Sequence, residues 1–152
     1  MISMGTMRML IAGAAIALPI SVAAQDMTLK LGHLANEANS WHKASMLFAE
    51  EVAKRTEGRI AVEVYPNDSL GREIDLINGM QLGTVEMTIT GESLQNWAPM
   101  AALLAIPYAH ASLEEMDAVA SGEIGDQIEA QIIERAQVRP IAYFARGPRN
   151  LT

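Results

Sequence analysis

The sequence predicts an α/β fold in which a mainly parallel sheet is flanked by helices. Over residues 27–90, segments in which apolar and polar residues alternate, as in a half-buried strand, are separated by segments with apolar residues at helical spacing. The resulting order is β-α-β-α-β. This order implies a parallel sheet that is covered by helices on both faces. The chain has 152 residues, 50% of them hydrophobic, which suits one domain with a core and is too short for two full-sized domains.

The first unit is a strand followed by a helix. Residues 27–31 alternate apolar and polar side chains and predict a strand, and residues 32–39 form a loop. Ser40 is the predicted cap of the helix, and Gly58 is its predicted stop. One face of this helix carries a stripe of apolar side chains at helical spacing. The stripe consists of Trp41, Ala44, Phe48 and Val52.

The second unit repeats this arrangement. Residues 60–65 alternate again and predict a strand, and the cluster at residues 66–69 predicts a turn. A helix is predicted over residues 72–82, with Gly83 as its stop. A third strand is predicted at residues 85–90. The helical side chains expected to point inward are Ile74, Ile77 and Leu82.

The last third of the chain is predicted to be largely helical. Residues 100–106 are apolar without a clear period. Helices are predicted at residues 113–120 and 123–136, separated by Gly122. Residues 138–144 predict a fourth strand. No linker marks a second domain in this sequence.

Residues 1–24 have the pattern of a secretory signal peptide. Arg8 is the only charged residue before Asp26, and a short apolar run at residues 9–20 precedes small residues that end at Ala24. The run is shorter than the roughly 20 apolar residues that a membrane-spanning helix needs. We therefore expect cleavage near Ala24 and an exported, soluble protein of the bacterial periplasm. An N-terminal membrane anchor is the alternative.

The composition argues against several classes of function. The net charge is −7, which makes the chain a poor candidate for binding nucleic acid. The absence of cysteine excludes disulfides, thiolate metal sites and a cysteine nucleophile. The three histidines lack metal-ligand spacing, and the sequence has neither a glycine-rich phosphate loop nor a nucleophile elbow. We therefore expect no metal, no cofactor and no enzymatic activity.

Three polar residues follow predicted strands. His33 follows the first strand, Glu92 the third and Arg149 the fourth. Open α/β sheets bind ligands at the carboxyl ends of their strands, and an arginine can donate two parallel hydrogen bonds to a carboxylate. The alternatives are exposed loop charges for Glu92 and Arg149 and an ordinary loop-edge histidine for His33. His42, on the first helix, is interpreted as a surface residue.

Short motifs are spread over nearly all of the chain after the predicted leader. The most specific are P-x-x-x-L-G at residues 66–71 and Q-L-G-T at residues 81–84. The others lie at residues 29–33, 48–52, 85–87, 106–108, 122–126 and 147–152. Together, and in this order, they resemble the solute receptors of tripartite ATP-independent periplasmic (TRAP) transporters, the DctP family.

This resemblance implies a fold and a function. The fold would be that of a periplasmic binding protein with two α/β lobes, of which residues 25–152 would form the N-terminal lobe, with the second lobe missing from this chain. The function would be to bind a small organic acid between the lobes and to deliver it to the membrane subunits of a TRAP permease. The receptor would not itself span the membrane.

The resemblance also assigns roles to individual residues. Arg149 would lie near the ligand carboxylate, with Pro148 beside it narrowing its pose. Glu92 would make a polar contact, and the loop that carries His33 and Leu34 would face the ligand. Two other functions stay open: a ligand-sensing receptor that reports to a signalling partner, and an exported hydrolase that uses Glu92 and a histidine. The hydrolase lacks a recognisable nucleophile or metal constellation.

Overall fold

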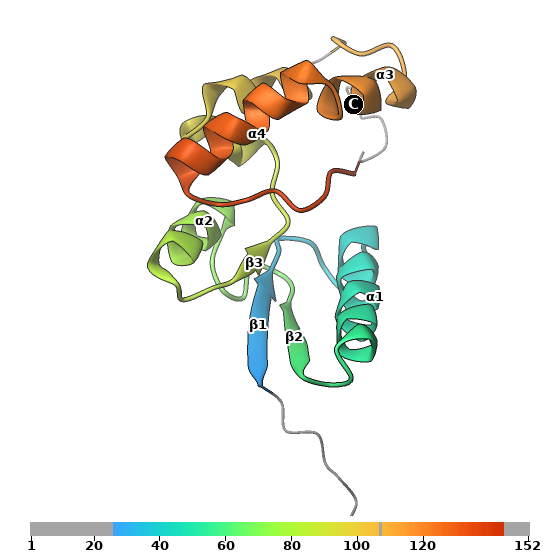
Figure 1. The fold of residues 1–152 in the computed structure, drawn as a ribbon, viewed down its shortest axis with the longest axis vertical. Coiled ribbons are helices and arrows are strands. Elements are labelled where there is room, and N and C mark those ends of the chain that lie inside the picture. The colour runs from blue at the N-terminus through green and yellow to red at the C-terminus, as the bar shows by residue number, and fades with distance from the viewer. Residues whose placement is uncertain (1–25, 107, 145–152) are drawn as a thin grey trace, which may run out of the picture.

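A three-stranded parallel sheet forms one half of the protein. The computed structural model describes residues 26–106 and 108–144. The strand order is β2-β1-β3, and both pairings are parallel (Figure 1). The strands are β1 (Met27–Gly32), β2 (Ile60–Tyr65) and β3 (Met87–Thr88). The predicted α/β class with a parallel sheet is confirmed, as are the positions of the first two strands.

Two crossover helices connect these strands. Helix α1 (Ser40–Arg55) leads from β1 to β2, and helix α2 (Glu73–Leu82) leads from β2 to β3. Figure 1 shows α1 beside β2, and α2 on the other side of the sheet beside β3. Parallel neighbours require such crossovers. As a result, the carboxyl ends of all three strands lie at one edge of the sheet.

The start of α1 differs from the prediction. Asn39, with extended backbone, is the N-cap, and its side-chain oxygen accepts a hydrogen bond from the Trp41 amide at 2.9 Å. The predicted cap at Ser40 is therefore wrong by one residue, although both residue types cap helices well. The predicted apolar stripe includes Ala44, but Ala44 is exposed, and its neighbour Ser45 is the buried residue of the helix. Burial of the Ser45 hydroxyl is possible because it donates to the Trp41 carbonyl at 2.8 Å.

The inward face of α2 is also different. Leu76 and Ile77 are fully buried, whereas Ile74 is 47% exposed and Leu82 is 80% exposed. Of the predicted inward residues, only Ile77 is correct. The cause is a close approach of the helix to β1: a Cβ atom at Gly32 would lie 2.6 Å from Cδ2 of Leu76. Because Leu76 fills this space, Ile74 and Leu82 turn away from the sheet.

The third strand is shorter than the predicted residues 85–90. Side chains continue the pairing beside its two ladder residues. The Glu86 carboxylate accepts a hydrogen bond from the Lys30 amide at 2.7 Å. The Thr88 hydroxyl donates to the Gly32 carbonyl at 3.0 Å. The Glu86 amide also donates to the Lys30 carbonyl at 3.3 Å, so backbone and side-chain bonds together hold the segment beside β1.

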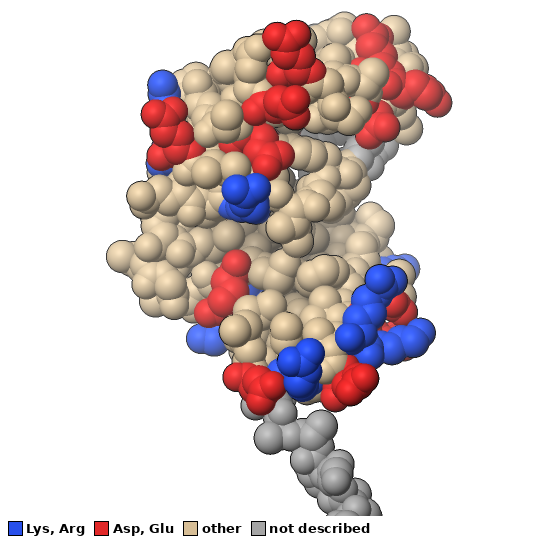
Figure 2. Space-filling model, in the orientation of Figure 1, with Lys and Arg blue, Asp and Glu red and all other residues tan. Residues whose placement is uncertain are grey.

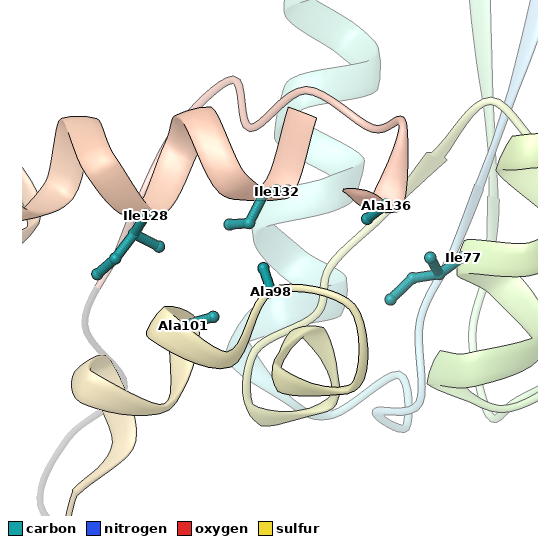
Figure 3. Packing of buried hydrophobic residues seen from close by; sticks show 6 residues of the cluster. All are labelled: Ile77, Ala98, Ala101, Ile128, Ile132 and Ala136. Atoms are coloured by element: carbon teal, nitrogen blue, oxygen red, sulfur yellow. The ribbon is translucent and has the colours of Figure 1, made fainter. Parts of the chain in front are cut away.

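A helical layer packs on the sheet half. It contains η1 (Glu92–Asn96), η2 (Pro99–Ala105), α3 (Leu113–Ala120) and α4 (Glu123–Ala136). The bounds of α3 and α4 are those predicted. Its buried cluster joins the two halves, because Ile77 of α2 belongs to it (Figure 3). The members are Ile77, Ala98, Ala101, Ile128, Ile132 and Ala136. No helix in the described part of the chain is long and apolar enough to cross a membrane.

The predicted fourth strand is wrong. Residues 138–144 form no strand and run back beneath α4 toward α1 (Figure 1). Val138 packs against the buried cluster, and Phe144 meets the ring of Trp41 edge-on, with centroids 6.3 Å apart. The apolar side chains of this segment therefore contact helical elements near both of its ends instead of a neighbouring strand.

Candidate ligand-binding cleft

A cleft of about 450 Å³ lies at the carboxyl edge of the sheet. Leu34 follows β1, Asp68 follows β2 and Ser93 follows β3, and all three line it. This is the edge at which open α/β sheets bind ligands. The other lining residues come from the start of α2. They are Arg72, Glu73, Ile74 and Asp75.

Backbone hydrogen bonds tie together the loops that form this cleft. The Asp68 amide donates to the His33 carbonyl at 3.3 Å, and the Asn67 amide donates to the Ala35 carbonyl at 3.1 Å. Asn67 and Asp68 both have positive φ, a conformation that these two residue types tolerate better than most. The loop after β1 and the turn after β2 therefore form one connected wall. Leu34 lies on this wall, between its two anchored neighbours.

The cleft combines one cation with several carboxylates. Arg72 lies beside Asp68, Glu73 and Asp75 in its lining. The Asp75 carboxylate accepts a hydrogen bond from the Arg72 amide at 3.0 Å and so holds the first turn of α2. The Glu73 carboxylate accepts from the Thr90 hydroxyl at 3.3 Å. Such a lining can donate to an acid through Arg72 and accept from hydroxyl groups through the carboxylates.

The predicted site residues are distributed unevenly. Leu34 lines the cleft and is 40% exposed. Glu92 is exposed at the start of η1, next to the lining residue Ser93. His33 is fully buried behind the cleft wall and does not line the cleft. Arg149 lies outside the described residues.

Sequence reasoning missed Arg72 as a site residue. It was noted only as the start of a predicted helix. The signal was nevertheless present, because Arg72 follows the turn after the second strand, at the same sheet edge that singled out Glu92. The strand-end rule, that open α/β sheets bind ligands at the carboxyl ends of their strands, would have included Arg72 if it had also been applied to the second strand.

His33 and His42 form a pair that the sequence did not predict. Nε2 of His33 lies 3.3 Å from Nδ1 of His42, and the rings are tilted by 57°. Nδ1 of His33 is buried and has no hydrogen-bond partner in the part of the chain that the structure describes. Burial, and then the charge of His42, lower the pKa of His33, while the Ala35 carbonyl opposes this shift. The interpretation of His42 as a surface residue is therefore incomplete.

Two nitrogen ligands do not make a metal site. Structural and catalytic zinc sites take at least three protein ligands. Among residues 26–106 and 108–144, no three or more side chains of His, Asp or Glu gather in a way that could hold a metal ion. The pair is therefore best described as a hydrogen bond between two imidazoles.

The charge distribution sets the surroundings of the cleft. Figure 2 shows acidic side chains gathered over the helical layer and both signs of charge mixed over the sheet half. The whole chain carries a net charge of −7. An anionic ligand would therefore depend on local cations for its recognition, and Arg72 is the cation in the described lining.

An α/β lobe with a mixed polar cleft at its sheet edge is the architecture of a small-molecule binding protein. Residues 31–152 match the family described as bacterial extracellular solute-binding protein, family 7 (DctP). The chain belongs to this family, and the resemblance in its motifs is confirmed.

Similar proteins have been studied in other bacteria. A solute-binding protein of Roseobacter denitrificans is 79% identical over 129 residues, which are 85% of this chain and 40% of that protein. A crystal structure of a TRAP periplasmic solute-binding protein from the same organism, with bound L-galactonate, superposes with a TM-score of 0.80 at 78% identity. The superposition covers 82% of the present chain and 41% of the Roseobacter chain.

A more distant structure comes from Haemophilus influenzae. This TRAP periplasmic solute-binding protein, with bound L-gulonate, superposes with a TM-score of 0.66 at 29% identity. The superposition covers 72% of the present chain and 36% of the Haemophilus chain.

The present chain spans about 40% of the length of the curated relative from Roseobacter.

Proposed function

We propose that this protein is the solute receptor of a TRAP transporter and that its ligand is a hydroxylated organic acid of the aldonate type. The observation that carries the proposal is the cleft at the carboxyl edge of the sheet, with one arginine among three carboxylates. The 78% identity with a receptor that holds L-galactonate supports it. Galactonate has one carboxylate and a chain of hydroxyl groups, which is the chemistry that this lining complements.

The lining suggests how such a ligand would bind. Arg72 donates to the ligand carboxylate, and each such charge-assisted hydrogen bond contributes about 1.5–3 kcal/mol. Glu73 and Asp68 accept hydrogen bonds from ligand hydroxyls. The apolar side chains of Leu34 and Ile74 pack against the carbon chain.

The remaining predicted residues complete the site. Arg149 supplies a second guanidinium for the carboxylate, and Glu92 supplies a further acceptor beside Ser93. His33 acts indirectly, because its side chain is buried and its backbone belongs to the cleft wall. Closure of a second lobe over the cleft would remove water and strengthen these interactions.

We further infer that residues 1–24 are a signal peptide and that residues 25–152 form the N-terminal lobe of the receptor. The mature protein then lies in the periplasm and delivers its ligand to the membrane subunits of the permease. Expression in a Gram-negative host, followed by mass spectrometry of the periplasmic fraction, tests the first part. The expected N-terminus is Gln25, and retention of Met1 in a membrane fraction contradicts a cleaved leader.

A panel of ligands tests the proposed chemistry. The full-length gene product is heated with L-galactonate, L-gulonate or succinate in large excess, and its unfolding temperature is recorded. Both aldonates are expected to raise this temperature by several degrees, because a ligand that binds only the folded state stabilises it. Succinate has carboxylates without hydroxyls and should raise it less. Equal shifts with all three acids contradict the hydroxylated ligand, and no shift with any of them contradicts the receptor function.

A further inference from the structure

A buried histidine pair stands directly behind the cleft wall. His33 is fully buried at the end of β1, and its Nε2 contacts Nδ1 of His42 in the first turn of α1 at 3.3 Å. This contact joins the helix to the loop of residues 33–35 across nine positions of sequence. Neither imidazole lines the cleft.

The backbone of His33 connects this pair to the cleft. The His33 amide donates to the Tyr65 carbonyl at 3.0 Å, and the His33 carbonyl accepts from the amide of Asp68, which lines the cleft, at 3.3 Å. The next residue is Leu34, another lining residue. A displacement of the His33 side chain would therefore move two parts of the lining at once.

We propose that His42 is a positioning residue of the cleft: its imidazole holds His33, and His33 holds the loop that carries Leu34, so that placing a proton on both rings releases the loop and weakens ligand binding. This inference rests on the proposed function of the cleft. It adds a residue, His42, that does not touch the ligand, and it makes binding depend on pH.

The chemistry of the contact explains the pH dependence. A hydrogen bond between two imidazole nitrogens needs one N–H donor and one bare acceptor, so it persists while the pair carries at most one extra proton. When both rings are imidazolium, both nitrogens are donors and two positive charges repel each other at close range. Burial of His33 adds to the cost, because a buried charge without a partner is unfavourable.

Charged residues around the pair do not offset this repulsion by hydrogen bonding. Lys43 follows His42 in α1, Glu37 lies in the loop before α1, and Asp68 lies in the turn after β2. Among the described contacts, none of these three side chains hydrogen bonds to either imidazole. Protonation of both rings would therefore leave two positive charges at close range, with Nε2 of His33 and Nδ1 of His42 3.3 Å apart.

The test compares variants of the full-length gene product across pH. L-Galactonate is titrated into wild type, His42→Gln, His42→Leu and His110→Gln between pH 5 and pH 8. His110 is the matched control, since it lies in a different part of the fold, near the Leu103 carbonyl. Wild type and His110→Gln should both bind L-galactonate more weakly at pH 5 than at pH 7.5.

The two substitutions at His42 separate the hydrogen bond from the charge. Glutamine can keep a hydrogen bond to His33 and cannot become charged, so His42→Gln should lose most of the pH dependence. Leucine cannot make the bond, so His42→Leu should bind about fivefold more weakly already at pH 7.5 and should also show a flat profile. A wild-type affinity that is the same at pH 5 as at pH 7.5, or a His42→Gln profile identical to that of wild type, overturns the inference.

A second readout makes the test independent of the ligand. In the ligand-free protein, the backbone amide NMR signals of Leu34 and Asp68 should move with pH in wild type and in His110→Gln, and should stay in place in His42→Gln. Absence of L-galactonate binding at every pH would contradict the proposed function, and the amide signals alone would then decide the role of His42. If the amide signals of Leu34 and Asp68 follow pH equally in all four proteins, the positioning role of His42 is overturned.

Discussion

Arg72 is the residue on which the proposed recognition of an acid at the described cleft most depends. Arg72 lines the described cleft together with Asp68, Glu73 and Asp75. The backbone of Arg72 is held separately, by the bond from its amide to Asp75. Truncation of the side chain should therefore remove a ligand contact and leave the first turn of α2 in place.

Replacement of Arg72 by alanine should weaken binding of L-galactonate by about 10- to 100-fold, as expected for the loss of one charge-assisted hydrogen bond. Calorimetric titration of the full-length gene product measures this change. The matched control is Arg55→Ala, at the exposed end of α1, where Arg55 pairs with Glu51 at 3.1 Å. A similar loss of affinity in both variants contradicts a specific role for Arg72.

His33 makes a separate prediction about stability and pH. Its pKa is lowered in the folded protein by burial and by His42, from an ordinary value of 6.5. As the pH falls below 6.5, the unfolded chain takes up a proton that the folded protein resists, so the free energy of unfolding decreases. The decrease from this one group is at most about 1.4 kcal/mol per pH unit and ends near the folded pKa.

Chemical denaturation between pH 8 and pH 5 measures this effect. Wild type and the control His110→Gln should lose stability over this range, and His33→Gln should lose less. Identical pH dependence in all three proteins would show that His33 is not the group responsible.

At the scale of elements, the helices were predicted better than the sheet. The bounds of α3 and α4 followed from apolar periodicity and from Gly122 between them. The short β3 did not, because it pairs with β1 only at Met87 and Thr88, whereas the pattern predicted a strand over residues 85–90. Residues 138–144 were misassigned because their apolar side chains contact helices, as Val138 and Phe144 do, and not a neighbouring strand.

Helix α4 offers a direct test of the buried cluster. Ile128 is fully buried, whereas Ile124, one turn earlier on the same helix, is 44% exposed. Ile128→Ala should lower the free energy of unfolding by about 2–5 kcal/mol, because it removes buried methylene groups and leaves a cavity. Ile124→Ala should cost less than about 1 kcal/mol. Urea denaturation compares the two, and equal costs would contradict the assigned core.

At the scale of the whole molecule, the location of the cleft was predictable and its contents were only partly so. The strand-end rule leads to the edge where Leu34, Asp68 and Ser93 meet. It does not predict that His33 turns away from this edge to meet His42, because a contact between a loop and a helix depends on how α1 packs. Arg149 keeps its predicted role as a proposal, outside the described residues.

The overall charge makes the local chemistry decisive. With a net charge of −7, the molecule does not attract anions as a whole, and acidic side chains cover the helical layer (Figure 2). The proposed selective binding of an acid would therefore come from cations at the cleft, of which Arg72 lies in the described lining. A ligand that keeps the hydroxyls and lacks the carboxylate isolates this contribution.

Calorimetric titration of the full-length gene product with L-galactonate and with galactitol, the uncharged polyol of the same chain length, tests this claim most directly. The account predicts that L-galactonate binds and that galactitol binds at least tenfold more weakly, because only the former offers a carboxylate to the arginines. Equal affinity for the two compounds, or no heat of binding with L-galactonate, would contradict a receptor for hydroxylated acids.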